Sequence, residues 1–160
     1  MSKRRFRQKS VTLSILTREN NRRNNQTYSY MATHNEKGRV GESMACDYLR
    51  EKGYAILETN WRYGKLEADI IAYTDDIIVF VEVKTRSNNT FGEPETFVDK
   101  AKQRAYVRLA NHYITEKKRT EEARFDIIAI TTDGTTTTLN HFPNAFTVID
   151  ALSKTTHINV

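Results

Sequence analysis

At 160 residues the chain has the length of one domain with a sizeable core, and its contents of 38% hydrophobic and 28% charged residues are typical of a globular protein. No apolar run approaches the roughly 20 residues that a membrane helix needs, and "SVTLSIL" near the start is too short for a signal-peptide core. The single cysteine, Cys46, excludes an internal disulfide and a zinc site of several cysteines. A cytoplasmic protein that does not enter a membrane is the simplest expectation.

The net charge of +5 is concentrated at the start of the chain. Residues 1–30 contain eight Lys or Arg residues and one acid, whereas residues 31–160 contain 17 basic and 19 acidic residues. The polar stretch "RENNRRNNQ" has no apolar periodicity, so residues 1–33 are predicted to form a basic, disordered extension. Two interpretations stay open: the extension is an arm that contacts nucleic acid, or Met31 is the true start.

The rest of the chain alternates helical and strand patterns. In residues 38–52 apolar side chains recur at helical spacing, and Gly53 follows as a stop signal. A loop is expected at 87–96 and a second helix at 98–119. The predicted strands are 54–62, 66–73, 77–86, 124–131 and 136–142.

This order of elements predicts an α/β domain over residues 34–146, with a mixed central β-sheet flanked by helices. The predicted core has the order α-β-β-β-α-β. Residues 147–160 are expected to form a C-terminal tail that either adds a short helix or frays.

The stretch "IIVFVEVKTR" (77–86) is the most apolar run, yet Glu82 and Lys84 interrupt it. Alternate residues of a strand share a face, so Glu82 and Lys84 lie on one face of it. If the preceding turn centres on "DD" (75–76), directly paired residues have numbers that sum to 151. Asp69 then lies opposite Glu82, and Glu67 lies opposite Lys84, with Cβ atoms about 4.5–5.5 Å apart.

The two predicted pairs have different meanings. Glu67 with Lys84 would be an ordinary ion pair between strands. Asp69 opposite Glu82 is a pair of like charges, which destabilises the metal-free hairpin unless a cation neutralises it. Mg²⁺ and Mn²⁺ take oxygen ligands, and Mg²⁺ keeps several waters, so two or three carboxylates suffice. Lys84 would then orient or deprotonate an attacking water, or stabilise charge on a phosphate.

A third carboxylate, Glu42, lies at the margin of the apolar face of the first predicted helix. It can point toward the sheet and reach the same metal ion. The simpler interpretation is a favourable contact between an acid and the positive end of the helix dipole. Both interpretations stay open, whereas the four scattered histidines show no ligand spacing.

The ordered set "GRVGESMACDYLREKGYAILETNWR", "LEADIIAY", "VFVEVKTR", "RFDIIAI" and "HFPNAF" resembles the bacterial YraN family, over about residues 38–146. Those proteins look like endonucleases of the PD-(D/E)xK, Holliday-junction-resolvase-like fold. Two positions depart from the expected pattern: Ala68 stands where the motif has proline, and Leu66 where glycine is expected.

The resemblance implies a nuclease constellation of Glu42, Asp69, Glu82 and Lys84. Asp69 and Glu82 would hold Mg²⁺ or Mn²⁺ for phosphodiester hydrolysis, with Glu42 as a direct or water-mediated ligand and Lys84 positioning the water. The backbone carbonyl of Val83 would be a further ligand. Lys100 and Gln103 fall where related nucleases carry an accessory polar residue.

The implied partner is nucleic acid, with DNA favoured over RNA and branched DNA included. A catalytically silent nucleic-acid-binding or accessory module is the alternative, because the part beyond residue 30 is slightly acidic and phosphate neutralisation dominates affinity for DNA. A junction binder would need a homodimer and a local basic rim. The candidates for that rim are Arg62, Lys65, Arg86, Lys100, Lys102 and Arg104.

Overall fold

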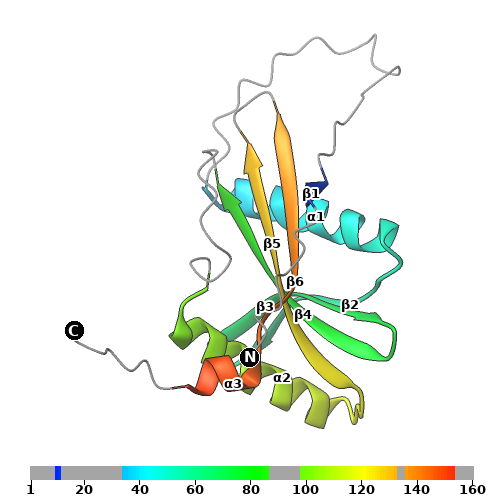
Figure 1. Cartoon of the computed structure of the whole chain (residues 1–160), viewed down its shortest axis with the longest axis vertical. Coiled ribbons are helices and arrows are strands. Elements are labelled where there is room, and N and C mark those ends of the chain that lie inside the picture. The colour runs from blue at the N-terminus through cyan, green and yellow to red at the C-terminus, as the bar shows by residue number, and fades with distance from the viewer. Residues whose placement is uncertain (1–9, 12–33, 87–97, 133–135, 154–160) are drawn as a thin grey trace, which may run out of the picture.

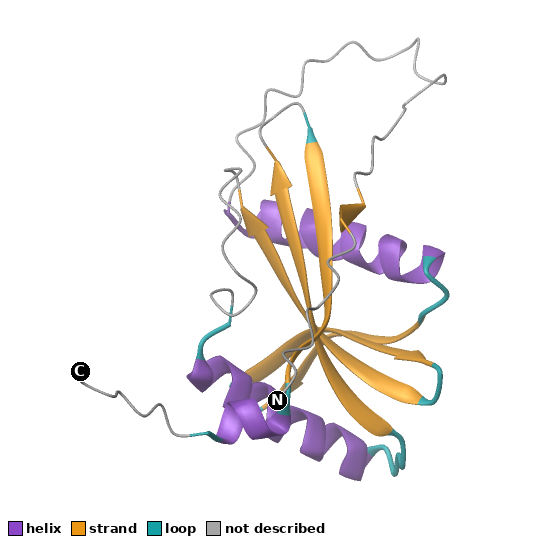
Figure 2. Ribbon diagram, in the orientation of Figure 1, coloured by secondary structure: helices purple, strands orange, loops and turns teal. Residues whose placement is uncertain are grey.

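Six strands form one strongly twisted mixed sheet with helices on both faces (Figures 1 and 2). The computed structural model describes residues 10–11, 34–86, 98–132 and 136–153. The helices are α1 (His34–Glu51), α2 (Lys100–Glu116) and α3 (Val148–Leu152). The strands are β1 (Ser10–Val11), β2 (Ala55–Tyr63), β3 (Leu66–Thr74), β4 (Ile77–Arg86), β5 (Glu122–Thr132) and β6 (Thr137–Phe146).

The strand order across the sheet is β1-β6-β5-β4-β3-β2. β4 pairs with β5 in parallel and with β3 in antiparallel, which confirms the predicted mixed sheet. The helices and strands from α1 to β6 follow the predicted order, and "IIVFVEVKTR" is the strand β4 at its predicted bounds. Because β4 is central and covered on both faces, its first half reads as a continuous apolar run.

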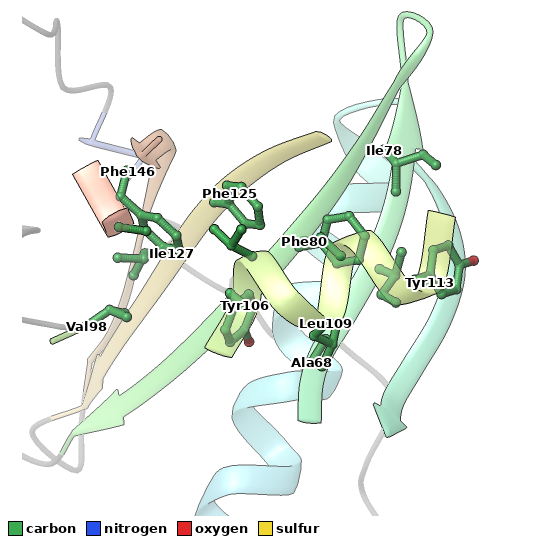
Figure 3. Close-up of a cluster of buried hydrophobic side chains, with 14 of the residues drawn as sticks. Ala68, Ile78, Phe80, Val98, Tyr106, Leu109, Tyr113, Phe125, Ile127 and Phe146 are labelled. Carbon is green, nitrogen blue, oxygen red and sulfur yellow. The ribbon is translucent and has the colours of Figure 1, made fainter. Parts of the chain in front are cut away.

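The core has two halves, one on each face of the sheet. On one face α1 packs Ala45 and Leu49 against strand residues such as Ile70. On the other face α2 packs Tyr106 and Tyr113 onto a larger cluster (Figure 3). α3 lies beside α2 (Figure 1) and buries Ala151 fully in that second cluster.

Local sequence explains how the β3–β4 hairpin and the helix ends form. Asp75 and Asp76 both have positive φ, 48° and 60°, as a two-residue type I′ turn requires. Gly53, at φ 86°, follows the end of α1 and closes it with a hydrogen bond from its N–H to the Arg50 carbonyl at 2.9 Å. Asp99 caps α2 by accepting from the Lys102 N–H at 2.8 Å.

Each end of the described chain adds one short element. Inside the expected extension, Ser10 and Val11 form β1, which was not predicted, and pair with Asn140 and Leu139 of β6; the other residues of 1–33 lie outside the described part. In the tail, Val148–Leu152 form the short helix α3, one of the two outcomes that the sequence left open, and the predicted loop 87–96 lies outside the described residues. None of the described helices is long and apolar enough to cross a membrane.

Candidate functional site

The candidate site lies where β3 separates from β4. The ladder between β3 and β4 has the predicted register: its pairs run from Thr74–Ile77 to Ile70–Val81, and the two residue numbers of each pair sum to 151. The ladder ends at Ile70–Val81, whereas β4 continues beside β5 to Arg86. Asp69 and Glu82 are the next residues in this register. They stand at the point where β3 and β4 separate, which we call the fork.

Asp69 closes the fork with its side chain. Its Oδ2 accepts a hydrogen bond from the backbone N–H of Val83 at 2.7 Å, in place of the next bond of the ladder. Burial and then the charge of Glu82 raise the pKa of Asp69 to about 7, against the weaker opposite effect of the Val83 N–H. Without metal, this carboxyl is therefore partly protonated at neutral pH.

Glu82 is buried on the face covered by α2, where three donors surround its carboxylate. Lys84 Nζ lies 2.7 Å from Oε1, Lys102 Nζ lies 3.0 Å from Oε2, and the Tyr106 hydroxyl donates to Oε2 at 2.6 Å. Burial acts to raise the pKa of Glu82, but these donors together hold that pKa below its usual value. In the metal-free protein, the expected repulsion is thus relieved by a proton on Asp69 and by two ammonium groups on Glu82.

The predicted ion pair between Glu67 and Lys84 is wrong. Glu67 pairs with Arg62 of β2 at 3.0 Å, and Lys84 pairs with Glu82. The reason is that β3 and β4 have already separated at Glu67. On the N-terminal side of Ile70, β3 remains paired with β2 but no longer with β4.

Glu42 approaches the fork from α1. The Asn60 side-chain amide donates to Glu42 Oε2 at 3.0 Å. Asn60 has a positive φ of 53° and lies between the pairs Thr59–Ile70 and Trp61–Ala68, and hence opposite Asp69. The Glu42 charge adds to the raised pKa of Asp69, after the larger effects of burial and Glu82.

A close approach between α1 and β4 fixes the position of Glu42. A Cβ added to the neighbouring Gly41 would collide with Thr85 Oγ1, so only glycine allows the helix to lie this near the strand. Thr85 Oγ1 is buried and has no hydrogen-bond partner in the part of the chain that the structure describes. A cavity of about 560 Å³ adjoins this contact, and Glu42, Val83, Lys84 and Thr85 are among its lining residues.

The donor set at the fork suits a hard divalent cation. Asp69 and Glu82 are neighbouring carboxylates whose charges are balanced here by a proton and two lysines, and a small oxygen-seeking ion can take the place of both. Lys84 and Lys102 side chains are 35% and 38% exposed, so each can move aside. Among the described residues, no three His, Cys, Asp or Glu side chains converge as ready-made ligands.

Several predicted residues lie elsewhere. Lys100 and Gln103 are on the side of α2 that faces α3: Lys100 Nζ donates to the Asp150 carbonyl at 2.7 Å, and Gln103 Nε2 donates to the Val98 carbonyl at 3.0 Å. The sequence interpretation missed Asn60 and Tyr106, and it gave Lys102 only a place in a basic rim. The four-residue spacing of Lys102 and Tyr106 on one helix was the available signal.

A second polar cluster, on the α1 face, is structural. Asp126 is buried and accepts from Arg124 Nη2 at 2.7 Å, from the Asn144 N–H at 2.8 Å, and contacts His141 Nε2 at 2.9 Å. Burial acts to raise the pKa of Asp126, but His141 and Arg124 outweigh it and lower that pKa.

Comparison with known proteins shows which chains are similar to this one in sequence. The profile of the uncharacterised protein family UPF0102 matches residues 41–130. A UPF0102 protein of Flavobacterium psychrophilum is 46% identical over 116 residues, which cover 72% of this chain and 98% of that protein. UPF0102 proteins of Christiangramia forsetii and Thermodesulfovibrio yellowstonii are 47% and 44% identical, over 72% and 69% of this chain and 98% and 96% of theirs.

These similarities confirm the predicted resemblance at the level of the family, which is YraN-like. The likeness to PD-(D/E)xK nucleases stays a prediction, as do the DNA partner and the homodimer. The matched region spans the elements from the Gly41 contact to β5, and thus contains every residue of the fork.

Proposed function

Since this chain belongs to the uncharacterised protein family UPF0102, whose name states no activity, we propose its function from the residues of the fork. We propose that the protein is a metal-dependent endonuclease that hydrolyses phosphodiester bonds in nucleic acid, DNA in the first place. The observation that carries the proposal is the meeting of two acids, the half-buried Asp69 and the buried Glu82, with Lys84 Nζ 2.7 Å from Glu82. An ion pair of Glu82 with a lysine that served only the structure would not need a second acid, Asp69, opposite Glu82.

Each residue has a defined part in the proposed reaction. Asp69 and Glu82 would hold Mg²⁺ or Mn²⁺, and Glu42 would hold a water of the ion. When bound, the ion supplies charge stabilisation for the phosphate and a more acidic water. Lys84, released from Glu82, stays within reach of that water and of a phosphate oxygen, so that it orients the nucleophile and balances developing charge. The Val83 N–H keeps Asp69 in place throughout.

One observation favours a second function, a catalytically silent module that binds nucleic acid or assists a partner. Lys84 and Lys102 already neutralise Glu82 with good geometry at 2.7 and 3.0 Å. A site that has lost its metal could persist in this form, because the two ammonium groups compensate the buried carboxylate.

Calorimetric titration with Mn²⁺ and Mg²⁺, beside a nicking assay, separates the two functions. The assay offers duplex, single-stranded and branched DNA, and RNA. The endonuclease binds metal and cleaves at least one substrate, and Asp69→Asn loses both properties. Binding of metal or nucleic acid without any cleavage supports the module, and absence of metal binding contradicts the endonuclease.

A further inference from the structure

Three rings form a stack that leads from the core to the surface at the tip of the β2–β3 hairpin. Trp61 meets the core residue Tyr113 edge-on, with centroids 5.1 Å apart. His112 of α2 lies 6.0 Å from Trp61, at an interplanar angle of 32°. Tyr63 covers His112 in nearly parallel stacking, with centroids 3.5 Å apart and planes 14° apart.

The outer ring of this stack, Tyr63, rests on His112 and remains open to solvent. Glu116 contacts His112 Nε2 at 3.2 Å, within the same helix. Tyr63 is 45% exposed. Because His112 covers one face of the Tyr63 ring, that exposure belongs to the opposite face and the ring edge. An open aromatic face backed by a second ring is suited to stacking a planar ligand such as a nucleobase.

The stack lies close to the fork along two elements. Tyr63 pairs with Leu66, and Asp69 is three residues further along β3, about 10 Å at the rise of a strand. On α2, His112 follows Lys102, the partner of Glu82, by ten residues, about 15 Å along the helix. A few nucleotides of extended strand span these distances.

The helix α2 is basic between the fork and the stack. From Lys102 to His112 it carries Lys102, Arg104 and Arg108 and no acid. Arg104 and Arg108 are exposed, and so is Lys65 in the turn after Tyr63. Cations that hold the phosphates, together with an aromatic ring that stacks a base, are the combination by which proteins hold single strands without reading their sequence.

We propose that Tyr63, backed by His112, stacks an unpaired base of the strand whose phosphate lies at Asp69 and Glu82, and that the protein therefore prefers single-stranded or branched nucleic acid to intact duplex. Only the position of the phosphate rests on the proposed endonuclease function, because stacking itself needs no metal. In intact duplex both faces of each base are already covered, and freeing a base costs energy.

Binding in EDTA tests this directly, using oligonucleotides that carry the fluorescent base 2-aminopurine as a single strand, in the arm of a splayed duplex and in a full duplex. We expect the wild type to quench the fluorophore in the first two. Tyr63→Ala should lose the quenching and bind single strand about tenfold more weakly, with duplex affinity unchanged. Tyr63→Phe keeps the ring and should behave as the wild type. Ile149→Ala, which removes an apolar side chain that is 81% exposed on α3, is the matched control and should change nothing.

Unchanged quenching and affinity in Tyr63→Ala, or equal binding of duplex and single strand by the wild type, would overturn the proposal. If Tyr63→Ala does not fold, Tyr63→Leu replaces it, because leucine covers His112 without offering a ring. The two proposals fail separately. Quenching that depends on Tyr63, without cleavage in Mn²⁺, removes the endonuclease and keeps the stacking site. Cleavage that Tyr63→Ala leaves unchanged keeps the endonuclease and removes the stacking site.

Discussion

At the scale of single residues, Asp69 and Glu82 show how two acids share a partly buried place without metal. Glu82 keeps its charge because Lys84, Lys102 and Tyr106 donate to it. Within the described part of the chain, Asp69 has the Val83 N–H as its one side-chain donor, and its pKa rises to about 7. The two environments assign different roles: Glu82 is the permanent anion, and Asp69 is the group that must lose a proton when metal binds.

The raised pKa of Asp69 predicts pH-dependent metal binding. Below about pH 7, Mn²⁺ must displace a proton from Asp69, so its affinity should fall about tenfold per pH unit and should level off above pH 7. In the metal-free protein the same shift means that Asp69 contributes less stability as the pH rises from about 4 to about 7. Calorimetric titrations between pH 5.5 and 8 check the first statement. An affinity that does not change across this range would contradict it, and Asp69→Asn provides the baseline.

The two lysines on Glu82 should differ in function although they are similarly exposed and touch the same carboxylate. Lys84→Ala should retain Mn²⁺ binding but slow cleavage by about 100-fold or more, because it removes a group that acts in the transition state. Lys84→Arg should not restore the rate, since guanidinium differs in shape and does not give up its proton. Lys102→Ala is the matched control and should cost much less. Equal losses in Lys84→Ala and Lys102→Ala would show that Lys84 has no special role.

At the scale of elements, the sequence predicted the strand β4 and the register in which it pairs with β3. The apolar alternation and the Asp75–Asp76 turn were enough to predict the register that brings Asp69 to Glu82. The partners of Glu82 from α2 were not predictable, because the rotation of a helix over a sheet depends on packing across the whole face. The error over Glu67 has a related cause: strand periodicity does not show where a ladder ends.

The contact between α1 and β4 gives a prediction about an element. Gly41→Ala should push α1 away from Thr85, reduce stability by about 1–3 kcal/mol, and weaken Mn²⁺ binding as Glu42 moves. Gly38→Ala lies on the same helix and meets nothing within 4 Å, so it should be neutral or slightly stabilising. Thermal melts with EDTA and with Mn²⁺ measure both effects. A Gly41→Ala protein that is as stable as Gly38→Ala would mean that α1 can shift without cost.

At the scale of the whole molecule, the charge pattern along the chain set residues 1–30 apart from the rest but did not predict the strand β1 inside that segment. Two residues of β1 pair with β6 at the edge of the sheet. Periodicity cannot detect so short a strand, because alternation needs several residues to show.

Deletion of residues 1–30 tests what β1 contributes. The shortened chain should still unfold cooperatively and bind Mn²⁺ as before, since the fork lies on β3 and β4. Its free energy of unfolding should fall by up to about 2 kcal/mol, because the strand pairing of Ser10 and Val11 with β6 is lost. Val11→Pro in the full chain removes one backbone donor and is the matched control. If the basic segment contacts phosphates, the deletion also flattens the salt dependence of nucleic-acid binding. Loss of cooperative folding would show that this segment belongs to the core.

The most direct test of the central claim is the single-turnover rate at which the full chain cleaves a branched DNA in Mn²⁺ at pH 8, compared with Glu82→Gln. Glutamine keeps the size of the side chain and can still accept from Tyr106, but it lacks the charge that would hold the ion. If Asp69 and Glu82 hold the metal, the wild type cleaves the DNA, EDTA abolishes this cleavage, and Glu82→Gln cleaves at least about 100-fold more slowly. Cleavage at the same rate by both proteins, or in EDTA, would contradict the assignment of Asp69 and Glu82 as the metal site.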